Sequence, residues 1–212
     1  MAERPIFVPV ETGPRLVREM PISFTWNPGM APSQKKKNIA ALHKAASLRG
    51  LEPILEISSK SEKEIGRRLS AFNLMIIFDG REISIESAFQ ASKVFERGGP
   101  FKDLSTKGSR DARRDPRLKE CGRLIGFEYE GERYSIWPKT AFYDWLYLNA
   151  LFRDRDSLTE ILYFAGFSDI EFNPSRSINC QARSCATFVA LNTRGLLDDA
   201  LESFGEFSAL LQ

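Results

Sequence analysis

The chain has little of what metal sites and disulfide frameworks require: three cysteines and a single histidine among 212 residues. The spacing of Cys180 and Cys185 is wrong for a zinc knuckle, and an odd number of cysteines makes no complete disulfide framework. We therefore expect no metal and interpret the cysteines as small buried residues or free thiols. His43 is expected on the surface of its helix, without a functional role.

The chain also lacks a large excess of positive or negative charge, since it has 30 basic and 28 acidic residues and a net charge of +2. This balance argues against a histone-like or tail-driven nucleic-acid binder, so contact with nucleic acid needs a local patch. No apolar run approaches the length of a membrane span, and the first residues do not resemble a secretory signal. We expect no membrane association and a cytoplasmic location.

What the chain does have is a hydrophobic content of 42%, with sixteen Phe, which suits one globular domain or one domain with an N-terminal extension. The hydrophobic patterns predict an α+β fold dominated by helices. Strands are expected near residues 5–26, 53–57 and 76–83, the last as a hairpin turning at Asp79-Gly80. The helices expected from caps and periodicity are 34–48 capped by Ser33, 62–70, 85–97 capped by Ser84, 141–152 capped by Thr140, one from Ser157, and a helical C-terminal segment.

The most informative stretch is Ser84-Ile-Glu-Ser-Ala-Phe-Gln-Ala-Ser-Lys93. On a helix, Glu86, Gln90, Lys93 and Arg97 fall within one narrow arc. A carboxylate, an amide and an amine would thus project together from a helix whose other side enters the core. The alternative is a solvated face stabilised by pairs three and four residues apart.

Together with Leu69-Ser-Ala-Phe-Asn73 and the hairpin before it, this stretch resembles the NADAR family. Members carry a Ser-Asn-Phe-type segment, a hairpin, and a helix that opens with Glu and continues into Gln-Ala-x-Lys. The run from Tyr143 to Leu158 resembles the family's second long helix, and residues 169–179 stand where it has its ligand-contacting C-terminal loop. The resemblance covers about residues 55–195.

The sequence departs from the usual pattern of the family in two places, and in both it resembles one divergent branch. Arg176-Ser-Ile-Asn179 replaces the usual Trp-Gly of the last loop, and residues 1–54 have no counterpart in minimal members. That branch serves as antitoxin beside a DarT-type DNA ADP-ribosyltransferase. The resemblance implies a substrate, ADP-ribosylated guanine in DNA, a possible cognate DarT-type toxin as partner, and no cofactor. It also divides the chain into an N-terminal extension, 1–54, packed on a catalytic domain, 55–212.

The chemistry that this resemblance implies suits the residues of the arc. Cleavage of a ribosyl–nitrogen bond builds positive charge at the anomeric carbon and negative charge on the departing nitrogen. Glu86 is expected to stabilise the first or to activate water. Lys93 could donate a proton to the second, or attack the opened sugar as an amine if burial lowers its pKa. The sequence does not choose between these roles.

Other polar residues are expected to contact the substrate or DNA. Those assigned to the substrate are Ser58, Ser59, Lys60, Asn73, Gln90, Trp145, Ser177 and Asn179. Ordinary loops, a turn residue and a core aromatic are the alternatives. Residues 102–123 hold eight basic and four acidic residues, a net charge of +4. Those assigned to DNA phosphates are Lys107, Arg110, Arg113 and Arg114, against the alternative of a solvated surface of mixed charge.

Two other functions remain open from the sequence. One is an N-glycosidase acting on small metabolites such as intermediates of riboflavin synthesis. The basic segment and the N-terminal extension argue mildly against it, because a small substrate needs neither. The other is an antitoxin without enzymatic activity that binds and blocks its toxin.

Overall fold

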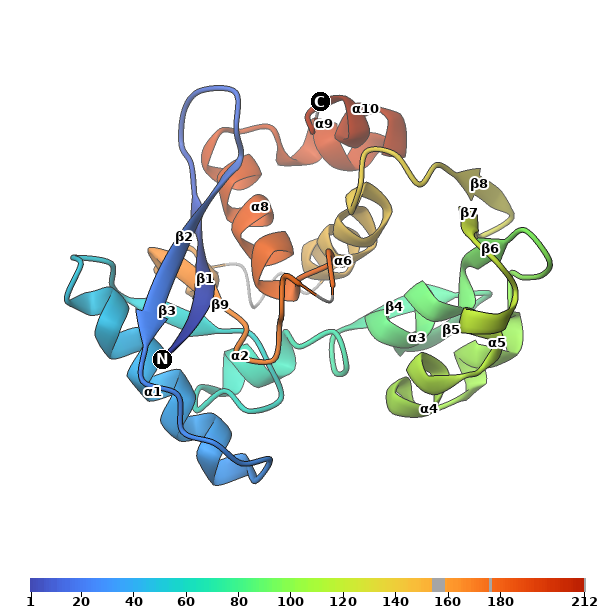
Figure 1. The fold of residues 1–212 in the computed structure, drawn as a ribbon. Coiled ribbons are helices and arrows are strands. Elements are labelled where there is room, and N and C mark those ends of the chain that lie inside the picture. The colour runs from blue at the N-terminus through green and yellow to red at the C-terminus, as the bar shows by residue number, and fades with distance from the viewer. Residues whose placement is uncertain (154–158, 176, 212) are drawn as a thin grey trace. The chain divides into compact units, whose positions relative to one another are not determined.

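The computed structural model describes residues 1–153, 159–175 and 177–211, and these divide into two compact units (Figure 1). The first unit comprises Met1–Ser70 and Leu151–Asp198. The second comprises Ala71–Ala150 and Asp199–Gln212. Helices and short strands occur in both units, so the predicted α+β class is confirmed.

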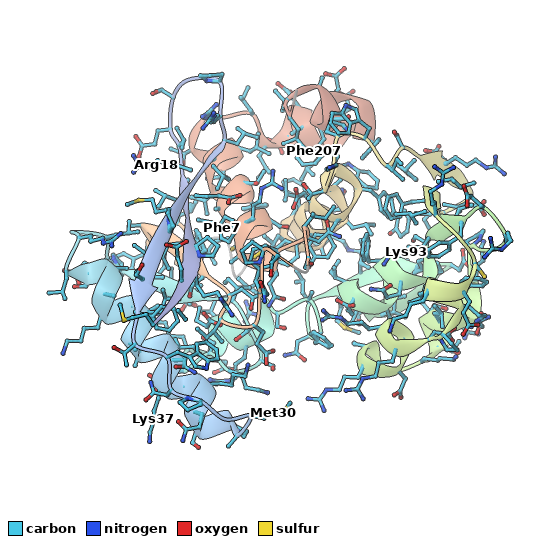
Figure 2. All side chains as sticks on the ribbon, in the orientation of Figure 1. Phe7, Arg18, Met30, Lys37, Lys93 and Phe207 are labelled. Atoms are coloured by element: carbon cyan, nitrogen blue, oxygen red, sulfur yellow. The ribbon has the colours of Figure 1, made fainter. Side chains whose placement is uncertain are left out.

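The first unit is built on a mixed sheet with strand order β2-β1-β9-β3. β1 (Ala2–Pro9) pairs along its whole length with β2 (Val17–Phe24). β9 (Gly166–Ser168) runs antiparallel to β1 and parallel to β3 (Ile54–Glu56). Figure 2 labels Phe7 on β1 and Arg18 on β2.

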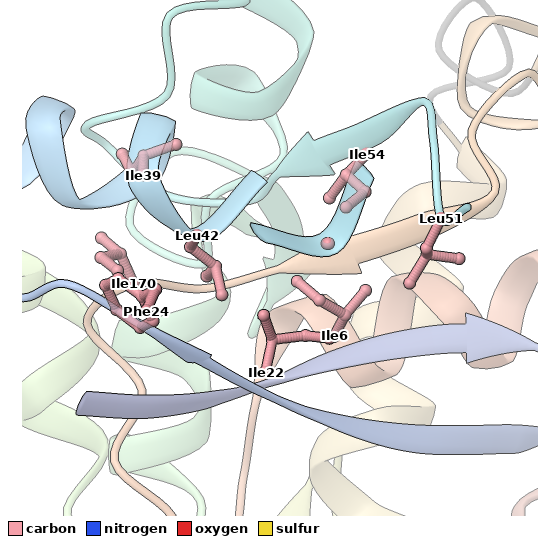
Figure 3. Close-up of a cluster of buried hydrophobic side chains, with 9 residues drawn as sticks. Ile6, Ile22, Phe24, Ile39, Leu42, Leu51, Ile54 and Ile170 are labelled. Atoms are coloured by element: carbon pink, nitrogen blue, oxygen red, sulfur yellow. The ribbon is translucent and has the colours of Figure 1, made fainter. Parts of the chain in front are cut away.

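Helices pack against this sheet. α1 (Pro32–Ser47) covers the face that carries Ile6, Ile22 and Phe24, and these side chains form a buried cluster with Ile39 and Leu42 of the helix (Figure 3). α8 (Gln181–Thr193) packs against β1 and β9, and the short α2 (Glu64–Arg68) follows β3 along the chain. These contacts remove one apolar stripe of each long helix from water.

The start of α1 corrects one prediction. The helix begins at Pro32 with Ala31 as its N-cap, so Ser33 lies inside the first turn and does not cap it. Proline favours the first helical position because its fixed φ suits the helix and its missing N–H would have no partner there.

The second unit opens with the predicted hairpin of β4 (Met75–Phe78) and β5 (Arg81–Ser84). Asp79 and Gly80 have φ of 46° and 73°, the signs that a type I′ turn requires. α3 (Ile85–Ala91) follows at once, and the side chain of Ser84 accepts a hydrogen bond from the backbone N–H of Ser87. Both the hairpin and the Ser84 cap are therefore confirmed.

The predicted extension of this helix to Arg97 is wrong. α3 ends at Ala91, and the chain continues into β6 (Lys93–Phe95), which pairs with β7 (Leu124–Tyr129). A third strand, β8 (Glu132–Tyr134), completes this sheet. β-branched and aromatic residues such as Val94 and Phe95 fit a pleated sheet better than a helix, and pairing with a distant strand overrides the local helical pattern.

A further long helix of the described residues is α6 (Ala141–Arg153), which begins after Thr140 as predicted. Shorter helices of the described residues include η1 (Lys102–Thr106), α4 (Ser109–Arg114), α5 (Arg117–Glu120), α9 (Leu197–Glu202) and α10 (Phe204–Ala209). The predicted helix start at Ser157 lies outside the described residues. Within the described part of the chain, no helix has the length and apolar character that crossing a membrane would need.

Candidate active site

The candidate site in the second unit begins with the burial of α3. Every residue from Ile85 to Ala91 is buried, including the polar side chains Glu86 and Gln90. The alternative of a solvated helix face is therefore wrong. The backbone N–H of Glu86 donates to the carbonyl of Ala71, which ties the first turn to the segment before the hairpin. Its carboxylate lies in the first turn of the helix, where the helix dipole favours negative charge.

Three side chains of the predicted arc are joined by hydrogen bonds. Gln90 Nε2 donates to Glu86 Oε1 at 2.9 Å, and Lys93 Nζ donates to Gln90 Oε1 at 2.8 Å. Lys93 reaches Gln90 although it lies one residue beyond the helix cap, on β6 (labelled in Figure 2). Arg97, the fourth member of the predicted arc, instead donates to the carbonyl of Glu120. Since Gln90 accepts with its oxygen and donates with its nitrogen, it holds the carboxylate and the amine in one series.

Lys93 is partly buried beside an aromatic ring. Its Nζ stands 4.6 Å from the centroid of the Phe89 ring. Burial lowers the pKa of Lys93 from 10.5 to about 8, while the negative charge of Glu86 raises it and the positive charge of Arg113 lowers it. A lysine with such a pKa supplies a neutral amine close to physiological pH.

Phe89 packs in a cluster of aromatic side chains. Its ring centroid lies 5.5 Å from that of Phe127 and 5.1 Å from that of Tyr143, while Phe127 and Phe142 stack at 4.3 Å. Trp145 belongs to the outer part of this cluster, where it packs against Tyr134, Tyr129 and Phe204. Its Nε1 is buried without a hydrogen-bond partner among the described residues. Stacking of Trp145 on a base stays a prediction.

The four predicted DNA contacts of the basic segment differ in their ion-pair partners. Lys107 Nζ contacts Asp115 at 2.8 Å, so its charge is already balanced by an acid of the same segment. Arg113 Nε lies 3.9 Å from Glu86 Oε1, which brings it beside the α3 series. Arg110 and Arg114 are exposed, and neither has an ion pair with another described residue. Lys107 and Arg113 are exposed as well, although each lies beside an acid, and contact of all four residues with DNA stays a prediction.

The other predicted substrate contacts are distributed over both units. Asn73 is exposed in the turn before β4 of the second unit. In the first unit, Ser58 is buried and donates to Glu56 Oε1 at 2.7 Å, and Lys60 Nζ donates to Ser59 Oγ at 3.0 Å. Ser177 Oγ donates to the carbonyl of Asn179 at 3.2 Å, just before α8 begins. Contact of these residues with a ligand stays a prediction.

The first unit also holds buried polar residues that sequence reasoning missed. Glu56, at the end of β3, accepts hydrogen bonds from Ser58, from Ser168 and from the backbone N–H of Ile170. Burial raises the pKa of Glu56, and the nearby carboxyl of Asp169 raises it further. Gln181 Nε2, on the first turn of α8, donates to Asp169 Oδ2 and to the carbonyl of Ile57. The parallel strands β3 and β9 end side by side, which explains why their following residues meet.

His43 belongs to the same group and is not the surface residue that we expected. Its Nε2 lies 2.8 Å from Ser168 Oγ, and burial lowers its pKa to about 4, so the ring is neutral. Two features made this contact hard to predict. The sequence placed His43 only by its position one residue after the buried Leu42 on the helix, and its partner Ser168 lies on β9, a strand of only three residues.

The fold and this constellation define a class: an α+β protein in which a buried carboxylate and a low-pKa amine are linked through an amide. The chain matches, over residues 2–212, the family described as DarT1-associated NADAR antitoxin, and it belongs to that family. The match includes residues 2–54. It follows that the protein is a DarT1-associated antitoxin, from a family generally associated with N-glycosidase activity. No curated protein matches the chain.

Proposed function

We propose that this antitoxin is an N-glycosidase that removes ADP-ribose from guanine bases in DNA and so erases the product of its toxin. The observation that carries the proposal is the series Glu86–Gln90–Lys93, formed in a member of the NADAR family. The reaction breaks the bond between the anomeric carbon and the guanine nitrogen, and it needs a group for each developing charge.

Glu86 is proposed to act at the anomeric carbon. As a carboxylate it stabilises the positive charge there, or takes a proton from the attacking water. Gln90 donates to one carboxylate oxygen, which leaves the second, Oε2, for the sugar or the water. The bonding pair leaves with the guanine nitrogen, which needs one proton.

Lys93 has two possible roles. As an ammonium group it donates the proton that guanine needs. As a neutral amine it attacks the anomeric carbon of the opened ribose, expels guanine and forms an imine, which water then hydrolyses to free ADP-ribose and the amine. The lowered pKa makes both protonation states accessible near neutral pH. The hydrogen bond to Gln90 and the contact with Phe89 support either role.

DNA as the substrate is supported by the exposed Arg110 and Arg114 on α4, the helix that also brings Arg113 to Glu86. Phosphate contacts by such side chains position a duplex or a single strand without reading its sequence. We propose contact with DNA for these two residues, and substrate contacts for Asn73, Gln90 and Trp145 within the same unit.

The test is to incubate the purified protein with ADP-ribosylated DNA and to measure free ADP-ribose. Release of ADP-ribose together with restored guanine is the expected result. Activity only on small N-glycosides would favour a metabolite hydrolase instead. Tight binding to the toxin without any release would favour an antitoxin that acts by blocking.

A further inference from the structure

Arg113 forms the far end of the charged series in the second unit. Its Nε lies 3.9 Å from Glu86 Oε1, the same oxygen that accepts the hydrogen bond of Gln90. A guanidinium, a carboxylate, an amide and an amine thus follow one another from α4 through α3 to β6. The side chain of Arg113 is 59% exposed, but that of Glu86 is only 10% exposed.

The start of α4 is tied to α3 by hydrogen bonds. Ser109 Oγ lies 2.7 Å from Ser84 Oγ, and Ser87 Oγ donates to the carbonyl of Lys107 at 3.3 Å. After the helix, the carboxylate of Asp115 accepts hydrogen bonds from Lys107 Nζ and Arg117 Nε, each at 2.8 Å. The first two bonds hold the start of α4 at α3, and the last two tie the residue after its C-terminus to its own segment, so hydrogen bonds hold the chain both before and after Arg113.

The charges around Lys93 come from two helices. Among the described residues, those around its amine, directly or through the Phe89 ring, include Glu86 and Gln90 of α3, Arg113 of α4, Phe127 of β7 and Tyr143 of α6. Of these only Glu86 and Arg113 carry a charge at neutral pH. Alone, the carboxylate would favour the protonated lysine, and the guanidinium opposes that effect.

We propose that Arg113 is a positioning residue that balances the charge of Glu86, so that a carboxylate and a reactive amine coexist within one series of contacts. This inference rests on the proposed function for the use of the amine. It also assigns Arg113 to the reaction centre, whereas the sequence grouped it with the DNA contacts. A residue that served only to bind phosphate would have no need to approach Glu86, so the 3.9 Å contact is the observation that sets Arg113 apart from the other predicted DNA contacts.

The experiment measures the titration of Lys93 in the intact protein without substrate. Trace acetylation from about pH 6 to about pH 11, read peptide by peptide by mass spectrometry, gives the midpoint for each lysine. Arg113→Gln should move the Lys93 midpoint upward by about half a pH unit, a modest shift because the guanidinium is partly screened by water. Arg113→Lys keeps the charge and should leave the midpoint near that of the wild type.

The matched control is Arg114→Gln, which removes an exposed guanidinium from the next position of α4. It should leave the Lys93 midpoint unchanged. An unchanged midpoint in Arg113→Gln, or an equal shift in both glutamine variants, would overturn the inference. The titration uses no substrate, so its result does not depend on the proposed activity. Failure to release ADP-ribose in the separate assay with modified DNA would refute the proposed function, while a Lys93 midpoint that does not respond to Arg113 would refute this inference alone.

Discussion

Replacement of Lys93 by arginine separates the two roles proposed for this residue. With a pKa of about 8, about a tenth of the Lys93 side chains are neutral amines at pH 7. At the ordinary value of 10.5 the neutral fraction would be about three hundred times smaller. Arginine keeps the charge near Gln90 and Glu86, but its pKa above about 12 lowers the neutral fraction by about four orders of magnitude.

If the amine attacks the sugar, Lys93→Arg should be almost inactive while still binding ADP-ribose. Borohydride should trap the imine on the peptide that contains Lys93 in the wild type and trap nothing in the variant. The rate of the wild type should rise with pH up to about 8, as the amine loses its proton, and then level off. Lys119→Arg, an exposed lysine of the same unit, is the control and should keep both activity and adduct. Substantial activity in Lys93→Arg, with no trapped adduct, would mean that Lys93 is an electrostatic contact and that Glu86 works with water alone.

Three further predictions concern stability and DNA. Burial raises the pKa of Glu56 to about 8, so the stability that this residue contributes is present below its ordinary pKa of 4.5 and is lost as pH rises through 8. Glu56→Gln should therefore flatten the dependence of the unfolding free energy on pH, measured by denaturant titration. An unchanged pH dependence would contradict the raised pKa of Glu56. Phe142→Ala, which removes a side chain only 1% exposed, should cost about 3–5 kcal/mol of unfolding free energy, against at most about 0.5 kcal/mol for Ala at the exposed Trp137. Replacing Arg110 and Arg114 by Glu should weaken binding of modified DNA and flatten the salt dependence of that binding, while hydrolysis of a free modified nucleoside should stay unchanged. Equal losses of activity on both substrates would show that these residues do not bind DNA.

Local signals in the sequence predicted the second unit best. Asp79-Gly80 and the Ser84 cap each act within four residues, so the hairpin and the start of α3 followed directly from them. The end of α3 could not be predicted in this way. It depends on the pairing of Lys93–Phe95 with Leu124–Tyr129, whose partner strand is about thirty positions away in the sequence.

The same limit applies to the polar residues. The helical arc of Glu86 and Gln90 was visible as a pattern, and the structure adds the hydrogen bonds that orient them. The approach of Arg113 to Glu86, and that of His43 to Ser168, join segments that carry no common pattern. Charge counting therefore placed Arg113 in a basic segment but could not distinguish it from the adjacent Arg114, for which no contact with Glu86 is found.

The most direct test of the proposed function compares the wild type with Glu86→Gln on ADP-ribosylated DNA, with free ADP-ribose and restored guanine as the readouts. Glutamine preserves the shape of the side chain and removes the charge that is proposed to act at the anomeric carbon. We predict that the wild type releases ADP-ribose and that the folded variant does so slower by orders of magnitude. Release at a similar rate by both proteins would contradict the assignment of Glu86, and release by neither would contradict the proposed activity.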